Sequence, residues 1–309
     1  MITIWALSFI MVNFTINIMP PLSLALYRFI IASLTFVIID IIIYLRKKDK
    51  IMRLIPENNS ILNVKNEKLN FTDWLFLILA SLSGISIFFY AQYNSINLIG
   101  PSLPALFVCL LSPVLITLLA LIFFKESLNF QKIIGFIIAT IGGFLLVTGG
   151  DIRTLAPKSP NFLGLFLAFL TPILWSIYSI ITKEISKKLS NIRMLKIISY
   201  LGTIELFTLV FIFGELEIFF KNFLNPLVFI VGIYLGVGCY VVGYYIWQYS
   251  QKNMKSLKVA SFLYIEPFIT LLVAIFLEIK QIIDIENIIG GIIVLFALFI
   301  INYDIRNEK

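Results

Sequence analysis

The sequence predicts an all-α polytopic membrane protein with ten transmembrane helices in two inverted five-helix repeats. Hydrophobic residues make up 60% of the chain and charged residues 13%, with a mean hydropathy of +1.00, whereas a soluble domain has about 25% charged residues. The apolar residues form runs of roughly twenty, the length that a helix needs to cross the hydrocarbon layer. In addition, motifs of the first half of the chain return in the second half.

The apolar runs are continuous, which excludes a barrel built from strands of alternating polarity. Helices are the expected spanning elements, because their backbone groups are satisfied within each segment. The polar stretch at about 46–71 is read as a solvated connector between spans 2 and 3. We place the ten spans at about 2–18, 22–45, 72–94, 101–124, 131–149, 161–182, 195–213, 226–249, 256–277 and 286–303.

Lysine and arginine gather on one side of these spans. The loops after even-numbered spans and the C-terminal tail hold nineteen of them, and the loops after odd-numbered spans hold four. Cytoplasmic loops carry the excess of basic residues, so we expect both termini in the cytoplasm and the protein in the plasma membrane. The net charge of +7 then reflects topology, and we expect no nucleic-acid partner.

The two halves share sequence at a nearly constant offset, and Trp5 and Trp175 hold similar places near the starts of spans 1 and 6. Residues 1–150 and 151–309 are therefore predicted to be two repeats, and five spans in each force the second into the membrane in the opposite sense. Such repeats enclose a site near the midplane in many secondary transporters. The matches are FYAQYNS (89–95) with YIWQYSQ (245–251), CLLSPVLITLLALIF (109–123) with LYIEPFITLLVAIFL (263–277), and QKIIGFII (131–138) with IENIIGGII (285–293).

Each repeat carries a proline at a matching place, Pro113 in span 4 and Pro267 in span 9. A proline removes one backbone hydrogen bond and bends or breaks a helix, so both are predicted helix breaks beside a central cavity. Glu266 precedes the second proline, and acids inside spans usually face the bundle interior. We expect it to bind a cationic group or carry a proton there. A structural acid bonded to the opened backbone is the alternative.

Glu205, near the middle of span 7, is the second candidate for the coupling group, with a hydrogen-bonded packing role as the alternative. The chain has no histidine, so a carboxyl is the natural proton carrier near neutral pH. Arg28 is expected to snorkel outward from span 2 or to pair with the loop backbone, with binding of a substrate anion as the minority interpretation. Cys109 and Cys239 lack metal-ligand spacing, and we expect neither a metal nor a cofactor.

Side chains at helical spacing form a polar and aromatic stripe on span 6, which must face a neighbouring helix or a cavity rather than lipid. We favour a cavity, because the repeat-related span 1 carries a similar stripe. Gly232 and Gly236 of span 8 are expected to allow close helix packing. The predicted cavity-lining residues are Trp5, Asn13, Tyr90, Ser112, Trp175, Tyr178, Ser179, Tyr240, Tyr244, Tyr264 and Glu266.

Together these features resemble the EamA-type ten-helix transporters of the drug/metabolite transporter superfamily over essentially the whole chain. The resemblance implies alternating-access export or exchange of small metabolites, often amino acids. In one departure, the glutamate that the family repeats at the ends of spans 4 and 9 is present as Glu126, but Gln281 takes its aligned place and Glu278 is displaced. The matching stretches are PPLSLALYRF (20–29), SPVLITLLALIFFKESL (112–128), IGFIIATIGGFLLV (134–147) and EPF (266–268).

The sequence therefore favours a secondary active transporter that exports or exchanges a small metabolite by alternating access, with proton coupling as one option. A membrane-embedded enzyme is an alternative, but it needs clustered acids, histidines or a metal motif, and the intramembrane acids here are scattered. A passive channel for a small apolar or lipid-like solute is another. We expect a small-molecule substrate, contact with the lipid bilayer, and a monomer or weak homodimer.

Overall fold

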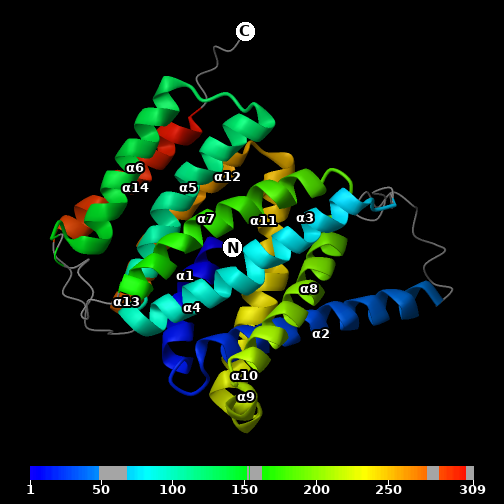
Figure 1. Ribbon diagram of the computed structural model, residues 1–309. Coiled ribbons are helices and arrows are strands. Elements are labelled where there is room, and N and C mark those ends of the chain that lie inside the picture. Colours follow the sequence, from blue (N-terminus) through cyan, green and yellow to red (C-terminus); the bar gives the residue numbers. More distant parts are fainter. Residues whose placement is uncertain (49–67, 152, 154–161, 277–284, 304–309) are drawn as a thin grey trace.

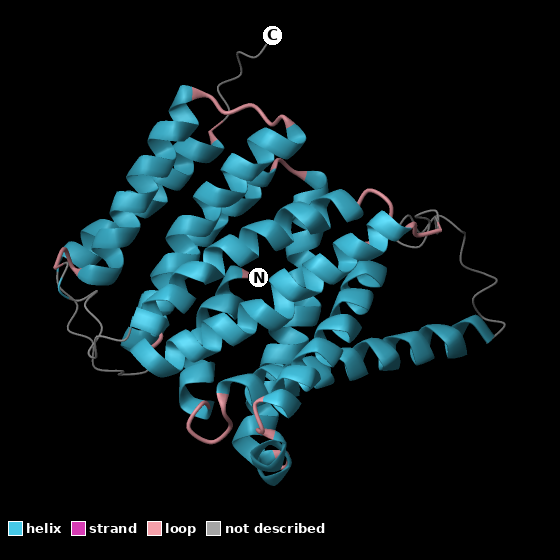
Figure 2. Cartoon of the chain, in the orientation of Figure 1, coloured by secondary structure: helices cyan, strands magenta, loops and turns pink. Residues whose placement is uncertain are grey.

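The computed structural model describes residues 1–48, 68–151, 153, 162–276 and 285–303 (Figure 1). Every regular element in these ranges is helical (Figure 2). The first half contains α1 (Ile2–Thr15), α2 (Pro21–Lys48), α3 (Phe71–Ser81), η2 (Leu82–Ser86), α4 (Ile87–Ile99), α5 (Ser102–Phe124) and α6 (Phe130–Thr148). The second contains α7 (Phe162–Ile185), α8 (Asn191–Ile212), α9 (Leu216–Asn222), α10 (Pro226–Ile233), η4 (Tyr234–Tyr244), α11 (Tyr245–Asn253), α12 (Ser256–Ser261), η5 (Phe262–Ile265), α13 (Glu266–Phe276) and α14 (Ile285–Asn302).

These elements follow the ten predicted spans, apart from the short α9, and most of the predicted connector lies outside the described residues. Two shorter apolar helices, α1 and the 130–146 part of α6, match spans 1 and 5, and span 9 is divided into α12, η5 and α13. The prediction of an all-helical membrane protein is confirmed. The described stretches long and apolar enough to cross a membrane are Pro21–Leu45, Phe71–Ile99, Pro104–Phe124, Phe162–Ile185, Asn191–Ile212, Pro226–Asn253 and Ile285–Asn302.

Polar side chains fix where several helices begin. Asn70 accepts a hydrogen bond from the Asp73 backbone N–H at 2.8 Å and receives one in return, which forms a capping box at the start of α3. Asn129, Ser190 and Asn225 cap α6, α8 and α10 by accepting backbone N–H groups of the first turn. These bonds satisfy donors that have no partner within their own helix.

Hydrogen bonds between α6 and α14, the last helices of the two repeats, show that the repeats run in opposite directions. Gln131 Nε2, at the start of α6, donates to Ile300 O near the end of α14 at 2.8 Å. Asn287 Nδ2, at the start of α14, donates to Leu146 O near the end of α6 at 2.9 Å. The two helices lie side by side (Figure 1) and are antiparallel, so the predicted inversion of the repeats is confirmed.

Small residues allow α6 and α14 to approach closely. A Cβ atom on Gly290 would overlap the Leu146 backbone nitrogen and lie 2.7 Å from Gly142 O. Close backbone approach of this kind is a main source of helix association in membranes. In span 8, a Cβ on Gly236 would lie 2.5 Å from Arg28 O of α2, so that glycine also serves close packing.

Around the centre of the bundle, helices of each repeat pack against helices of the other repeat. α7 of the second repeat packs against α4 and α5 of the first, and α1 of the first packs against η4 and α13 of the second. Each contact thus has a counterpart in the other repeat, as an approximate twofold relation requires. The inward faces of α1 and α7 therefore meet at the interface between the repeats.

Departures from α-helical geometry fall in spans 3, 8 and 9. The segments η2 and η4 are π-helical and lie at matching places of the two repeats; such segments are frequent at functional sites. In span 9 a 3₁₀ turn ends directly before Glu266 and Pro267, where a break was predicted. At the other predicted break, α5 continues as an α-helix through Pro113, because a proline deletes only one bond of the helix, the one to the Cys109 carbonyl.

Candidate functional site

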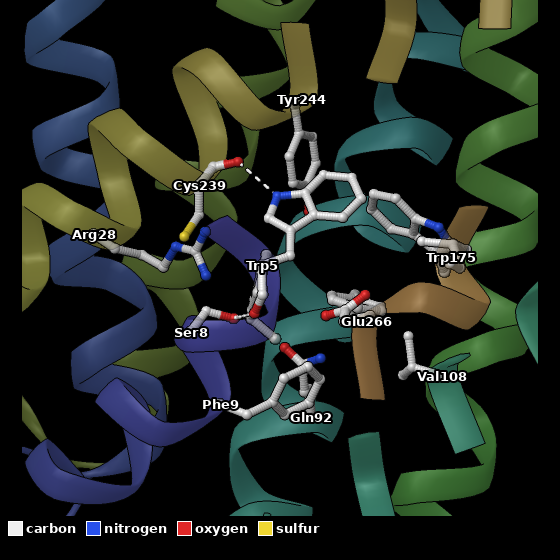
Figure 3. A pocket seen from close by; sticks show the side chains of 13 residues that line it. Trp5, Ser8, Phe9, Arg28, Gln92, Val108, Trp175, Cys239, Tyr244 and Glu266 are labelled. Atoms are coloured by element: carbon white, nitrogen blue, oxygen red, sulfur yellow. Dashed lines mark hydrogen bonds between the residues drawn. The ribbon is translucent and has the colours of Figure 1, made fainter. Parts of the chain in front are cut away.

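A cavity of about 50 Å³ lies between the two repeats (Figure 3). It has room for a few water molecules, because one water needs about 10–15 Å³. The first repeat contributes side chains from α1, α2, α4 and α5, and the second contributes them from α7, η4, η5 and α13. The lining residues are Trp5, Ser8, Phe9, Arg28, Phe88, Phe89, Gln92, Val108, Trp175, Cys239, Tyr244, Leu263 and Glu266.

Aromatic rings from both repeats meet at this cavity. The repeat-related Trp5 and Trp175 contact each other edge to face, with ring centroids 5.4 Å apart. The ring of Tyr244 lies 5.8 Å from Trp5 and 5.2 Å from Trp175 by the same measure. Each such pair contributes about 0.5–1.5 kcal/mol beyond the area it buries. The aromatic cluster therefore holds the two repeats together at the cavity.

The π-helical segments supply backbone acceptors to this cluster. Trp5 Nε1 donates to Cys239 O of η4 at 3.0 Å, and Tyr244 Oη donates to Gly84 O of η2 at 3.2 Å. The wider turn of a π-helix disturbs the normal ladder of backbone bonds, and buried carbonyls then need side-chain partners. Gly84 also leaves space for the ring of Tyr178, which a Cβ atom would overlap.

Glu266 lies in the cavity wall at the first position of α13, directly after the 3₁₀ turn. Its side chain is buried, with 3% of its surface exposed. The thiol of Cys109, from α5 of the other repeat, is a hydrogen-bond partner of the carboxyl. The end of the 3₁₀ turn in span 9 therefore places this acid in the cavity wall, inside the bundle.

Arg28 lies in the same cavity wall and does not snorkel outward as predicted. Its Nη1 donates to Tyr93 Oη at 2.7 Å, and its Nη2 donates to Leu235 O of η4 at 2.9 Å. The guanidinium carbon also lies 4.2 Å from the centroid of the Phe89 ring, within reach of a cation–π interaction. These three partners lie inside the bundle, which explains why the side chain of Arg28 points inward.

Two buried donors of the cavity have no hydrogen-bond partner among the described residues, Arg28 Nε and Trp175 Nε1. Buried polar groups are normally bonded to protein or ordered water, so these N–H groups are available to a ligand or to water. Figure 3 shows Arg28 and Glu266 on different sides of Trp5. The cavity thus combines a permanent cation, a carboxyl and aromatic surface.

Two predicted lining residues of span 6 lie behind the cavity wall. Tyr178 is fully buried; its ring stacks on Trp175 at 5.2 Å, and its hydroxyl accepts a hydrogen bond from Gln248 Nε2 at 3.0 Å. Ser179 Oγ donates to Trp175 O, one turn earlier in its own helix, at 2.8 Å. Neither side chain lines the cavity, because Tyr178 lies behind Trp175 and Ser179 is bonded to its own helix.

Two tyrosines predicted for the cavity are bonded elsewhere. Tyr240 Oη donates to Leu195 O of α8 at 3.0 Å, which holds its ring behind Tyr244. Tyr264 belongs to a separate apolar cluster with α6 and α14, and its hydroxyl donates to Leu110 O at 3.4 Å. Tyr240 lies one helical turn before Tyr244 in the sequence, yet of these two only Tyr244 lines the cavity.

The remaining predicted residues lie away from the cavity. Asn13 is exposed, although its neighbours Val12 and Thr15 in α1 are buried. Tyr90 is half-buried, and its ring lies 5.9 Å from that of Phe213. Ser112 is fully buried, with an Oγ that has no partner among the described residues. The coupling candidate Glu205 accepts hydrogen bonds from the two serines that bracket η2, Ser81 at 2.5 Å and Ser86 at 2.6 Å.

Several residues that line the cavity were not predicted from the sequence. Gln92 carried a signal, because it is a polar residue in a span and aligns with Gln248 in the repeat. Phe88, Phe89, Val108 and Leu263 carried none, since nothing distinguishes them from the other apolar residues of their spans. Sequence periodicity thus indicated where the two repeats face each other, but it did not separate the cavity wall from the layer behind it.

Comparisons with known proteins agree with the fold. An uncharacterized transporter of Archaeoglobus fulgidus is 25% identical over 302 residues, which cover 96% of this chain and 93% of that protein. The uncharacterized transporter YyaM of Bacillus subtilis is 21% identical over 303 residues, covering 98% of this chain and 91% of that protein. A crystal structure of another protein has the same fold, with a TM-score of 0.66, 15% identity and coverage of 97% of this chain and 94% of that one.

The family model that matches this chain is that of the EamA-like transporter family, and it matches twice. The two matches cover residues 1–148 and 162–303, which correspond to the helices of the first and the second repeat. Together they account for nearly the whole chain. This chain belongs to the EamA-like transporter family.

Proposed function

We propose that this protein is a secondary active transporter that exports or exchanges a small metabolite by alternating access. The observation that carries the proposal is the cavity between the inverted repeats, whose wall includes the charged residues Arg28 and Glu266. Charged residues inside spans usually mark substrate or ion pathways. Inverted repeats move about such a site in many secondary transporters, and membership of the EamA-like family supports the same function.

The chemistry of the cavity favours a small zwitterion with an apolar side chain, such as an amino acid. Arg28 is placed to bind a carboxylate, because its guanidinium forms strong charge-assisted hydrogen bonds. Glu266 is placed to bind the ammonium group, and the tryptophan rings offer apolar surface to the rest of the cargo. The cavity of about 50 Å³ is smaller than an amino acid, so the repeats have to separate on one side to admit it.

Glu266 has a second role in this proposal. A proton and the ammonium group of the cargo compete for the same carboxylate, so binding of one favours release of the other. Alternation between the two across the membrane would couple export of the cargo to entry of a proton. Exchange of one cargo molecule for another is the alternative, and it needs no protonation of Glu266.

Counterflow in proteoliposomes tests the proposal. Vesicles are loaded with unlabelled L-leucine, or with another apolar amino acid if leucine is not bound, and uptake of the labelled compound is followed. A carrier accumulates label transiently above equilibrium. A channel shows no such overshoot, and an enzyme changes the chemical form of the label; either result would contradict the proposal.

The same assay examines Glu266→Gln. We expect the initial counterflow rate to fall at least about tenfold, because removing one partner of a buried charge pair costs about 2–5 kcal/mol. Glu217→Gln is the matched control, since Glu217 is an exposed acid of α9 remote from the cavity lining. Unchanged transport with unchanged pH dependence in Glu266→Gln would exclude this residue as the binding and coupling group.

A further inference from the structure

Ion pairs between described residues join the two repeats at one face of the bundle. They are Glu126–Lys183 with 2.7 Å between nitrogen and oxygen, Asp73–Lys188 with 2.7 Å, and Asp40–Lys196 with 2.8 Å. In each of the three, the acid belongs to the first repeat and the lysine to the second. We call this face, where α2, α5, α7 and α11 end, the basic face; the lysine and arginine distribution predicts that it is cytoplasmic.

The pair of Glu126 and Lys183 is the most enclosed of the three, with side-chain exposures of 10% and 14%. Glu126 Oε1 also accepts a hydrogen bond from the Ser256 backbone N–H at 3.0 Å. Lys183 Nζ in turn donates to Ser256 Oγ at 2.8 Å. These three residues tie the end of α5 in the first repeat to the end of α7 and the start of α12 in the second.

The opposite face is joined differently. Hydrogen bonds between described residues join the repeats there: Ser23 Oγ donates to Glu215 Oε2 at 2.8 Å, and Tyr27 Oη donates to Phe223 O at 2.9 Å. The sequence shows the same asymmetry, because the repeat alignment places Gln281, outside the described residues, opposite Glu126. In the sequence alignment of the repeats, the acid that pairs with a lysine at the basic face thus corresponds to an amide.

We propose that Glu126, Lys183 and Ser256 form an electrostatic lock that holds the carrier closed at the basic face and separates each time the two repeats move to open it. The lock rests on the proposed function in one respect, since it requires the repeats to move relative to each other. Its partial burial limits screening by salt. On opening, both charged groups regain water, so the lock can be reversible.

Accessibility of a native cysteine tests the lock without any cargo. Cys239 lines the cavity and is 2% exposed, so a reagent reaches it only when one face opens. A charged, membrane-impermeant methanethiosulfonate is applied to either face of vesicles of known orientation at neutral pH. Mass spectrometry then measures the rate at which Cys239 is modified.

In Glu126→Gln we expect modification of Cys239 from the basic face to be faster by about fivefold or more, the lower limit of typical coupling between sites. Modification from the opposite face should slow, since the two open states compete. Glu184→Gln is the matched control: Glu184 is exposed near the same end of α7 and pairs with Lys187 of its own repeat. We expect this control to match the wild-type protein.

Equal rates for Glu126→Gln and Glu184→Gln would overturn the lock, as would faster modification from the opposite face. If Glu126→Gln does not fold, Lys183→Gln replaces it; if neither variant folds, these residues hold the fold itself and the proposal fails. The result is separable from the proposed function. A protein that shows no counterflow can still reveal the lock by labelling, and a working carrier with unchanged labelling rejects the lock alone.

Discussion

A charged side chain inside a membrane helix costs up to about 2.5–3.5 kcal/mol on insertion scales, with the largest cost at the helix centre, and the central cavity of this protein has two such residues, Arg28 and Glu266. Arg28 recovers part of this cost through Tyr93, Leu235 O and the face of Phe89. One of its N–H groups, Nε, has no partner among the described residues. At the scale of single residues, this unused donor is the feature that a purely structural arginine would not need.

The role of Arg28 leads to a prediction about ligand selectivity. We expect the wild-type protein to bind L-leucine at least about tenfold more tightly than leucinamide, because the amide lacks the carboxylate that Arg28 is proposed to bind. In Arg28→Gln this ratio should fall to near one. Binding is measured by the change in tryptophan fluorescence, since Trp5 and Trp175 line the cavity.

Deaminated leucine, 4-methylpentanoate, serves as the control ligand for that measurement. It keeps the carboxylate, so its affinity should also fall in Arg28→Gln, whereas the affinity for leucinamide should change little. A uniform loss of affinity for all three compounds would indicate damage to the fold. An unchanged ratio in a folded variant would assign Arg28 to structure alone.

Single residues also show what sequence can and cannot predict about this site. The pairing of Trp5 with Trp175 could be predicted, because the repeat places the two in related helices that an inverted duplication brings to the common axis. The inward direction of Arg28 could not be. Its position in the second turn of α2 fits both an outward and an inward side chain, and the choice depends on Leu235 O and Phe89, residues far away in the sequence.

At the scale of elements, the π-helical segments are the part of the fold that local sequence did not reveal. Backbone carbonyls of these segments accept hydrogen bonds from side chains of other helices: Cys239 O accepts one from Trp5, and Gly84 O accepts one from Tyr244. Helix positions and ends, by contrast, follow from apolar runs and from caps such as Asn129. The sequence predicts Tyr240 for the same cavity wall as Tyr244, but its hydroxyl bonds to Leu195 O of α8 and its ring lies behind Tyr244.

The close contact of α6 with α14 predicts a cost for enlarging Gly290. In Gly290→Ala the added Cβ would overlap the Leu146 backbone, and overpacking of this kind costs about 1–3 kcal/mol. The apparent melting temperature in detergent should therefore fall. Gly238→Ala is the matched control, because the nearest atoms lie 3.8 and 3.9 Å from its added Cβ. Equal melting temperatures for the two variants would contradict the packing argument.

At the scale of the whole molecule, the two repeats are joined by an apolar and aromatic interface at the centre and by ion pairs at the basic face. The inverted duplication itself followed from the constant offset between matching motifs. The ion pairs did not, because they join loops and helix ends whose separation in space the sequence leaves open. Asp40, for example, pairs with Lys196 of α8 at 2.8 Å, although the two residues are far apart in the sequence.

The electrostatic lock gives the whole molecule a defined response to pH. Burial raises the pKa of Glu126, but the hydrogen bond from Lys183 and the backbone N–H of Ser256 more than offset this, and the pKa lies below its ordinary value of 4.5. A carboxyl with a lowered pKa stabilises the closed state fully above that ordinary value. The stabilisation is lost as the pH falls through the lowered pKa, so acid should open the basic face and neutral pH should keep it closed.

Distances between spin labels on the two repeats measure this opening. Phe130→Cys at the start of α6 and Lys252→Cys near the end of α11 are both exposed positions at the basic face, one in each repeat. The population with the longer distance should stay constant from pH 7 to about pH 5 and grow below the ordinary glutamate value. Asp73 can also release Lys188 in acid, so the part due to Glu126 is the difference from Glu126→Gln. That variant should already show the longer distance at pH 7, because its amide cannot pair with Lys183 at any pH. If the labelled Glu126→Gln protein followed the same pH curve as the labelled parent, the acid response would not come from Glu126 and the lock at this residue would be contradicted.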